Sequence, residues 1–263
     1  MNLVPAPAPP PGDSFVQSFA RGLAVLRCFG ADAPAQTLTD VAERTGLTRA
    51  GARRILLTLL HLGYVSADGR LFRLTPKVLE LGYAYLSSLP LWSHAQPALK
   101  ELADTLRQSC SAAVLDGDDI VYVLRLSAHK TMSINLGIGS RLPAYCTAMG
   151  RVLLAGQDPA LLVRRLEHTA LLKLTPHTVV EPARLLDVIG TVREQGWCLV
   201  SEELEMGLVS IAAPIVGRDG QVVAAVNLSG QVGNTPLAAL LEQSLPRLLE
   251  TAAGVSALVR LQG

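Results

Sequence analysis

Three arginines lie in the first two turns of one predicted helix, over residues 49–61. Guanidinium groups donate hydrogen bonds to phosphates and to guanine edges, so a helix that exposes them suits the major groove of DNA. The alternative is an ordinary helix surface whose arginines are solvated. The residues expected to face DNA are Thr48, Arg49, Ala50, Arg53, Arg54 and Thr58, with His61 beside them.

The residues around the start of this helix have the pattern of a helix-turn-helix. A short helix is predicted over 39–45, and Gly46 can take the left-handed conformation that a tight turn needs. Ala42 is small where two helices must approach closely, and Thr48 can cap the second helix. Gly51 lies inside that second helix, where it weakens the helix without serving the turn. The arginines are therefore expected on the second helix of the motif.

A β-hairpin is predicted directly after the arginine-bearing helix. Residues 63–67 and 70–74 are expected as strands, joined by a turn at Asp68 and Gly69. Such a hairpin is typical of the wing in a winged helix-turn-helix. The basic residues expected on its return strand are Arg70 and Arg73.

The distribution of charge supports the same interpretation. The whole chain has a formal net charge of +1, which alone argues against a nucleic-acid binder. Residues 14–75, however, hold eight arginines, no lysine and four acids, a net charge of +4. Phosphate contacts need clustered positive charge, so this end of the chain is expected to bind DNA.

The length and composition predict two globular domains. The chain has 263 residues, 49% hydrophobic and 17% charged, which excludes a disordered protein. A first helix is predicted over 18–29 with Ser18 as its N-cap. The expected organisation is a disordered proline-rich leader over 1–14, a winged helix-turn-helix over 15–75, a connector helix over 76–91, and an effector-binding and oligomerisation domain over 92–263. The connector is apolar on more than one face, so it needs a partner in the chain or in another subunit.

Periodicity predicts an α+β fold for the second domain, with a mostly antiparallel sheet flanked by helices. Helices are expected over 94–109, 149–155, 159–167, 182–195 and 236–261. Strands are expected over 110–117, 118–128, 131–139, 197–201, 208–216 and 221–229.

Several classes of protein are excluded by what the sequence lacks. The four cysteines are scattered, with no CxxC pair and no histidine at metal-ligand spacing, so we expect no metal, no cofactor and no disulfide framework. The leader lacks the features of a signal peptide, and no apolar run is long enough to span a membrane. We therefore expect a cytoplasmic protein with no membrane partner.

The segment 139–156 brings together a strand end, an arginine and the start of a helix. Thr147 is a good N-cap, and the free amides near Ala148, Met149 and Gly150 would present a positive helix end to a carboxylate. The residues expected to complete this effector site are Arg141, as a bidentate partner, and Leu142 and Tyr145, as an apolar wall.

Other residues can contribute to the same site. Arg125, on a predicted strand, competes with Arg141 for the carboxylate unless it pairs with a nearby aspartate. Further residues that can line the pocket are Glu203, Met206, Ser210 and Asn227. The alternative to an effector site is an ordinary capped helix with an outward arginine.

Two other functions are alternatives to a ligand-sensing regulator. An enzyme carrying a DNA-binding appendage is disfavoured, because no GxSxG, HExxH, P-loop or dinucleotide-binding pattern is present. Cys146 beside His129 or His168 lacks an orienting partner for thiol chemistry, so no catalytic residue is assigned. A DNA-binding scaffold without an effector is the other alternative.

The motifs together resemble the IclR family of bacterial regulators over about residues 15–260. The resemblance rests on SFARGLAVLRCF, the helix-turn-helix, LFRLTPKVLELGYAYLSS, RLPAYCTAMGRVLLA and EQGWCLVSEELEMGLVSIAAPI. The segments AYLSSLPL, RLPAYCTAMGRVLLA and QGWCLVSEELEMGL are most similar to the regulators of the β-ketoadipate pathway.

The resemblance implies properties that the residues alone do not establish. It implies a GAF-like effector domain that senses protocatechuate, 4-hydroxybenzoate or β-ketoadipate, or else a carboxylate of another pathway. It also implies a homodimer that pairs into a tetramer on a palindromic or repeated operator, with RNA polymerase as a partner if the protein activates transcription. We expect the effector to close the loop over 141–150 and to act through the connector helix on the spacing of the recognition helices.

Overall fold

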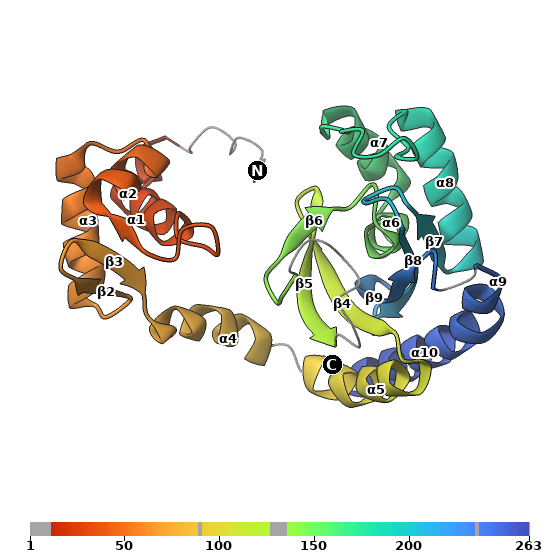
Figure 1. Cartoon of the computed structure of the whole chain (residues 1–263). Helices are drawn as coiled ribbons and strands as arrows, with labels where there is room; N and C mark the ends of the chain where they lie inside the picture. Colours follow the sequence, from red (N-terminus) through yellow and green to blue (C-terminus); the bar gives the residue numbers. More distant parts are fainter. Residues whose placement is uncertain (1–11, 89–90, 127–135, 235–236, 263) are drawn as a thin grey trace. The chain divides into compact units, whose positions relative to one another are not determined.

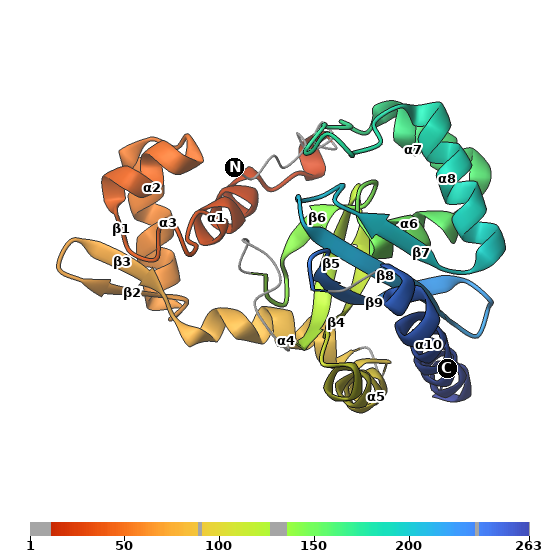
Figure 2. The ribbon, with the colours of Figure 1, turned by 45° about the vertical axis from the view of Figure 1, so that its right-hand side comes forward.

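The computed structural model describes residues 12–88, 91–126, 136–234 and 237–262. The chain divides into two compact units, Met1–Tyr85 and Leu86–Gly263. Each unit has its own hydrophobic core, so each is described by itself below (Figures 1 and 2).

The first unit combines helices with a small antiparallel sheet of strand order β1-β3-β2 (Figure 1). Its elements are α1 (Gln17–Arg27), β1 (Gln36–Thr37), α2 (Leu38–Thr45), α3 (Arg49–His61), β2 (Val65–Asp68), β3 (Leu71–Leu74), a 3-10 helix (Pro76–Val78) and α4 (Leu79–Ser87). Before α1, Gly12–Ser14 form a 3-10 helix. The rest of the leader, expected to be disordered, lies outside the described residues.

Local hydrogen bonds define the two helices of the helix-turn-helix. At the start of α2, Thr37 Oγ1 accepts from Asp40 N at 3.3 Å, and the Asp40 carboxylate accepts from Thr37 N at 2.8 Å. This reciprocal capping box satisfies two amides that the helix leaves unpaired. The helix ends at Gly46, whose φ of 67° is left-handed. Thr48 then caps α3 by accepting from Gly51 N at 3.1 Å. The predicted helix-turn-helix is confirmed.

Two details of the first unit differ from the prediction. Ser18 does not cap α1, because the helix already begins at Gln17 after Val16, which makes no side-chain cap hydrogen bond. The hairpin turn consists of Gly69 and Arg70 rather than Asp68 and Gly69, because Asp68 is paired with Leu71. Arg70 therefore lies in the turn of the wing and not on its return strand.

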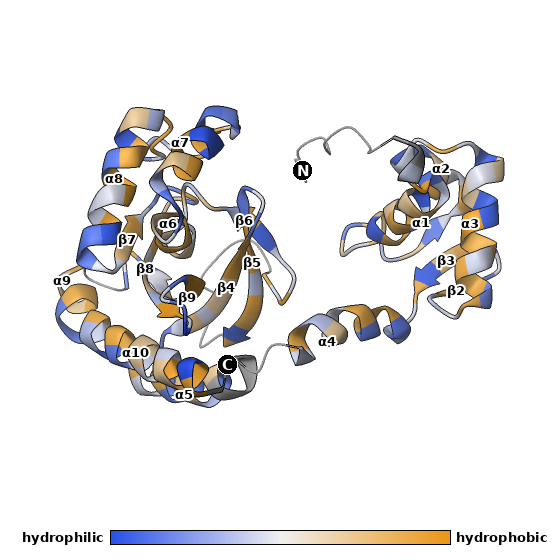
Figure 3. Ribbon diagram, turned by 180° about the vertical axis from the view of Figure 1, so that it is seen from behind, coloured by the Kyte–Doolittle hydropathy of each residue, from blue (hydrophilic) through white to orange (hydrophobic). Residues whose placement is uncertain are grey.

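The surface of α4 is apolar and exposed. Leu79, Leu81, Tyr83 and Tyr85 are between 48% and 73% exposed, and no residue of the helix is buried. Hydrophobic residues are visible along this helix in Figure 3. Leu86, at the end of α4, is partly buried against a core of the second unit, whereas the other large apolar side chains of the helix are not buried within the described part of the chain.

The second unit is built on a six-stranded antiparallel sheet of order β6-β5-β4-β9-β8-β7. Its elements are α5 (Leu91–Leu106), β4 (Ser109–Asp116), β5 (Asp119–Leu126), β6 (Arg141–Pro143), α6 (Ala148–Ala155), α7 (Pro159–His168), α8 (Pro182–Gln195), β7 (Cys198–Ser201), β8 (Leu208–Val216), β9 (Val222–Gln231), α9 (Leu237–Ala239), a π-helix (Leu240–Ser244) and α10 (Leu245–Gln262). The predicted α+β class and mostly antiparallel sheet are confirmed.

Helices cover both faces of this sheet (Figures 1 and 2). On one face α5 and α10 pack together over a core that includes Leu99, Ile211 and Leu248. On the other face α6 lies directly on the sheet and α8 packs against α6, around Met149 and Ile189. Because strand residues alternate between faces, neighbouring positions of each strand contribute to different cores.

Three boundaries in the second unit differ from the prediction. The helix predicted over 94–109 ends at Leu106, and Arg107 has a left-handed φ of 52° that breaks it before β4 begins at Ser109. Much of the strand predicted over 131–139 lies outside the described residues, and residues 136–140 are not strand. The edge strand β6 follows instead. The C-terminal helix contains a π-helical segment that periodicity did not reveal.

All four cysteines are free thiols. Within the described ranges no group of three or more His, Cys, Asp or Glu residues is arranged to hold a metal ion. Over the same part of the chain, no helix combines the length and apolar character that crossing a membrane requires.

Candidate functional site

The residues predicted to face DNA are all exposed on α3, at its cap, and on the wing: Thr48, Arg49, Ala50, Arg53, Arg54, Thr58, Arg70 and Arg73. His61, weighed beside them, is exposed as well. Within the described residues the arginines of this set form no ion pair, whereas Arg44 of α2 pairs with Asp32 at 3.0 Å. Their guanidinium groups therefore keep their donors for phosphates or base edges.

The two threonine hydroxyls of this set are engaged locally. Thr48 Oγ1 accepts from Gly51 N, and Thr58 Oγ1 donates to Arg54 O at 2.9 Å. Gly51 also has a steric role here. A Cβ at this position would lie 3.2 Å from Thr48 Oγ1, so a side chain would crowd the cap of α3. The contact gives Gly51 a local steric role, which the sequence alone did not indicate.

In the second unit, the sheet face beneath α6 changes from apolar to polar along its strands. Ala113, Ala212 and Ala225 contribute to the core on this face. Farther along the same strands, Ser111 pairs with Asn227, and Ser210 pairs with Ser229. Directly paired residues share a face of the sheet, so these side chains form one polar stripe at the end of the core.

A cavity lies beside this polar stripe. Its wall consists of Tyr122, Cys146, Thr147, Ala148, Met149, Val200, Glu203, Leu204, Leu208, Ser210, Asn227 and Ser229. The cavity has a volume of about 30 Å³. That space suits about two water molecules, so a benzoate-sized acid requires the walls to move apart.

The N-terminus of α6 forms part of this wall. Thr147 caps the helix by accepting from Gly150 N at 3.2 Å, and its hydroxyl donates to Pro143 O at 3.1 Å. The first-turn amides have no partner inside the helix and carry its positive end. Neither lysine nor arginine is among the wall residues described, and the one carboxylate among them, that of Glu203, is paired with Arg151. The donors that the wall offers to an anion are therefore amides and hydroxyls.

A buried ion pair fixes the loop that closes the cavity. Arg151 donates through both terminal nitrogens to Glu203, at 2.7 and 2.6 Å, and through Nε to Tyr145 O at 2.8 Å. Glu203 also accepts from Val179 N at 3.0 Å. The two side chains are only 3% and 10% exposed. Because Glu203 and two backbone segments are held by these bonds, the pair is a structural support of the cavity.

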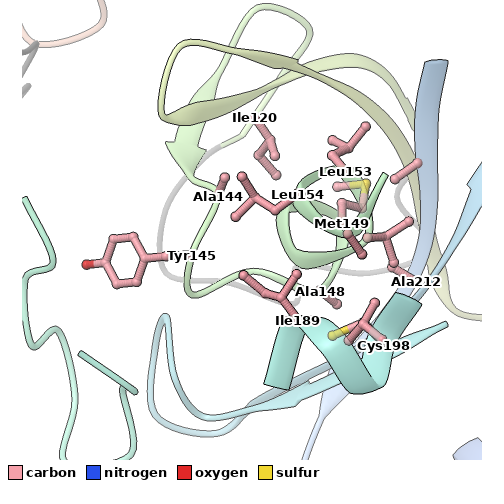
Figure 4. Close-up of a cluster of buried hydrophobic side chains, with 14 of the residues drawn as sticks. Ile120, Ala144, Tyr145, Ala148, Met149, Leu153, Leu154, Ile189, Cys198 and Ala212 are labelled. Carbon is pink, nitrogen blue, oxygen red and sulfur yellow. The ribbon is translucent and has the colours of Figure 1, made fainter. Parts of the chain in front are cut away.

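Tyr145 points away from the buried cluster around Met149 and Ile189 (Figure 4). Its hydroxyl donates to Leu172 O at 2.6 Å and accepts from Leu172 N at 3.0 Å. The side chain therefore anchors the segment after α7 to the loop that precedes α6.

The structure brings together six of the predicted effector-site residues at the cavity: Thr147, Ala148, Met149, Glu203, Ser210 and Asn227. Leu142 and Tyr145 are buried nearby but are not among the wall residues. Met206 is 53% exposed and also lies outside the wall.

Neither predicted arginine lies at the cavity. Arg141 is exposed on β6 and donates to the carboxylates of Asp116 at 2.6 Å and Asp119 at 3.0 Å. This is the outward arginine of the alternative interpretation, because its neighbour Leu142 takes the inward position of the strand. Arg125 stacks over the ring of Tyr122, with 5.9 Å between its guanidinium carbon and the ring centroid.

Sequence reasoning did not assign six of the wall residues to the effector site, namely Tyr122, Cys146, Val200, Leu204, Leu208 and Ser229. It also missed Arg151, which supports the wall. The signal for Arg151 was present, since a single arginine interrupts the apolar helix AMGRVLLA. A charge on a buried helix requires a partner, although its partner is 52 residues away in sequence.

Cys146 lies on the wall, but its environment does not favour nucleophilic chemistry. Burial raises the pKa of its thiol to about 12. The thiolate is the nucleophilic form of cysteine, so this side chain stays protonated near neutral pH. The environment of Cys146 thus adds no support to the thiol-nucleophile alternative.

Comparisons with known proteins match the chain over most of its length. The family model described as bacterial transcriptional regulator IclR C-terminal matches residues 83–257, and the IclR helix-turn-helix domain matches residues 18–69. The Pca regulon regulatory protein of Pseudomonas putida is 46% identical over 236 residues, 89% of this chain and 81% of that protein.

The names of two further similar proteins mention hydroxybenzoate. The p-hydroxybenzoate hydroxylase transcriptional activator of Acinetobacter baylyi is 37% identical over 245 residues, 91% of this chain and 90% of that protein. The crystal structure of an IclR homolog complexed with 4-hydroxybenzoate, from Microbacterium hydrocarbonoxydans, has a TM-score of 0.83 at 26% identity. The match covers 93% of this chain and 100% of that chain.

Proposed function

The chain belongs to the IclR family of bacterial transcriptional regulators, and from this premise we propose which acid it senses and which residues bind DNA and effector. It senses a small aromatic acid, such as 4-hydroxybenzoate or protocatechuate, in the cavity beside α6. The observation that carries the proposal is a buried cavity that joins the N-terminus of α6 to a polar stripe of the sheet. A carboxylate of another pathway is the alternative.

DNA binding is assigned to α3 and the wing. The exposed arginines at positions 49, 53 and 54 lie on the helix that follows the tight turn, and those at 70 and 73 lie on the hairpin. In winged helix-turn-helix proteins the second helix enters the major groove, so the helix arginines reach base edges and the hairpin arginines reach phosphates.

We expect Arg53→Ala to weaken operator binding by about 1–3 kcal/mol if Arg53 contacts a guanine edge. If it contacts a phosphate instead, the variant mainly lowers the dependence of affinity on salt. Fluorescence anisotropy with the DNA fragment that the wild-type chain enriches from a random-sequence pool measures both quantities.

Arg218→Ala is the matched control for this prediction. Arg218 is exposed in the turn between β8 and β9 of the second unit, so its removal changes the net charge equally and leaves α3 and the wing intact. Unchanged affinity and salt dependence in Arg53→Ala would remove Arg53 from the interface.

The effector is assigned to the cavity by its donors. The amides of Ala148 and Met149 stabilise a carboxylate through hydrogen bonds and the positive end of α6. Because the wall must expand, binding is expected to alter the loop around Glu203. Thermal-shift measurements with 4-hydroxybenzoate, protocatechuate and β-ketoadipate test this assignment, because a ligand that binds the folded state raises the melting temperature. No shift with any of them would contradict it.

The exposed apolar surfaces of the first unit support a homodimer that pairs further into a tetramer. Phe15, Val16 and Phe19 at the start of α1 are 44–68% exposed, in addition to the apolar side chains of α4. Several large apolar side chains exposed on one unit are consistent with an interaction site. In this proposal the protein is located in the cytoplasm. The bound effector acts through α4 and changes the distance between the α3 helices of the two protomers. RNA polymerase is a partner if the protein activates transcription.

A further inference from the structure

Asn227 presents an unsatisfied hydrogen-bond acceptor beside the cavity. The residue lies on the cavity wall and is 6% exposed. Its Nδ2 donates to Ser210 Oγ at 3.0 Å, whereas its Oδ1 is buried and has no hydrogen-bond partner among the described residues. Leaving a buried acceptor unpaired costs stability, so a ligand that supplies a donor gains affinity there.

The orientation of this amide is determined by its neighbour. Ser210 Oγ donates its one proton to Leu228 O at 3.1 Å. Toward Asn227 the hydroxyl must therefore accept, which requires the amide nitrogen and not the oxygen to face it. Exchange of the two amide atoms would require the Ser210 proton to turn from Leu228 O to Asn227 Oδ1, with loss of the hydrogen bond to Leu228 O. In the observed arrangement Oδ1 is an acceptor that no described residue uses.

A second unpaired polar atom lies next to Asn227. Ser111 is directly opposite Asn227 on the neighbouring strand, is fully buried, and its Oγ also has no partner in the described part of the chain. The two side chains share one face of the sheet. Neither atom has a hydrogen-bond partner among the described residues, although Arg125 lies directly opposite Ser111 on β5.

We propose that Asn227 determines effector specificity, with its Oδ1 accepting a hydrogen bond from a ring hydroxyl of the bound acid. The inference rests on the proposed function, because it assumes an aromatic acid in this cavity. A carboxylate only accepts hydrogen bonds, so Oδ1 repels it, whereas the first-turn amides of α6 attract it. The acid is thereby oriented with its carboxylate at Ala148 and Met149 and its hydroxyl at Asn227.

This arrangement predicts strong selection against acids that lack the hydroxyl. A site built to hydrogen-bond a hydroxyl rejects an analogue without it, because the buried acceptor is then left unpaired. A purely apolar pocket discriminates much less between an acid that has the hydroxyl and an acid that lacks it. We expect wild-type affinity for 4-hydroxybenzoate to exceed that for benzoate or 4-fluorobenzoate by at least about tenfold.

The test is calorimetric titration of the full chain with these three acids, for wild type, Asn227→Ala and Ser210→Ala. In Asn227→Ala the affinity ratio between 4-hydroxybenzoate and benzoate is expected to fall to about one, since the acceptor is gone. In Ser210→Ala the Asn227 amide is retained but loses its hydrogen bond to the serine hydroxyl. An intermediate affinity ratio between 4-hydroxybenzoate and benzoate is therefore expected. Circular dichroism shows whether each variant folds. If Asn227→Ala does not fold, the affinity ratio of Ser210→Ala is compared with that of the wild type instead.

The outcomes separate this inference from the function on which it rests. Equal wild-type affinities for all three acids, or a ratio that survives in Asn227→Ala, overturn the role of Asn227 and leave an aromatic-acid sensor standing. Binding of β-ketoadipate and of none of the three aromatic acids also overturns the role of Asn227, because β-ketoadipate has no ring hydroxyl. If no acid binds the wild-type chain, the proposed effector class fails, and the specificity inference fails with it.

Discussion

Glu203→Gln is expected to destabilise the effector domain by about 3–5 kcal/mol. The substitution removes one charge of a pair that is almost completely buried and leaves the Arg151 guanidinium without a counter-charge. An uncompensated buried charge is far more costly than the loss of an exposed ion pair. Urea unfolding of the full chain, followed by circular dichroism, measures the change in the free energy of unfolding.

Glu167→Gln is the control for this experiment, because Glu167 is exposed on α7. Its expected effect lies within about 0.5 kcal/mol. The double variant Arg151→Met with Glu203→Gln is expected to recover part of the loss, since no unpaired charge remains. A cost below about 1 kcal/mol for Glu203→Gln would show that water or a rearranged loop solvates Arg151.

Gly150→Ala is expected to destabilise the domain by about 2–3 kcal/mol and to abolish effector binding. A Cβ at this position would lie 2.1 Å from the backbone oxygen of Ala144, which is too close for any rotamer change to relieve. The turn from Ala144 to Thr147 must move, and the cap that positions the amides of α6 is lost with it. Thermal unfolding and titration with 4-hydroxybenzoate measure the two effects.

Gly190→Ala provides the matched control. Gly190 lies inside α8, and a Cβ there would meet no atom within 4 Å. Replacing a helical glycine with alanine typically stabilises by about 0.5–1 kcal/mol. The two substitutions add the same methyl group, so opposite signs are expected. Equal effects would contradict the steric argument.

The sequence predicted the elements better than the directions of single side chains. Helices α6, α7 and α8 and strand β8 follow from apolar spacing and caps, because those signals are local. Arg141 was misplaced for a local reason as well, since a shift of one residue along a strand moves a side chain to the other face. Short edge strands such as β6 offer little pattern from which to judge this.

The polar stripe of the candidate effector site could be predicted only in part. Ser210 and Asn227 were identified on their strands, but their hydrogen bond depends on the register between β8 and β9. The pairing of Arg151 with Glu203 depends on the path of the loop after β7. Contacts of this kind join residues distant in sequence, so periodicity and spacing do not specify them.

The central claim is that an acid bound in the cavity changes how α3 engages DNA. It is tested most directly by operator binding and small-angle scattering of the full chain, with and without saturating 4-hydroxybenzoate. We expect the acid to change operator affinity by about 5–150-fold, the usual range of coupling between two sites. Thermodynamic linkage requires the operator to change the affinity for the acid by the same factor. Identical operator affinity and identical scattering in both states, under conditions where the acid is bound, would contradict the claim.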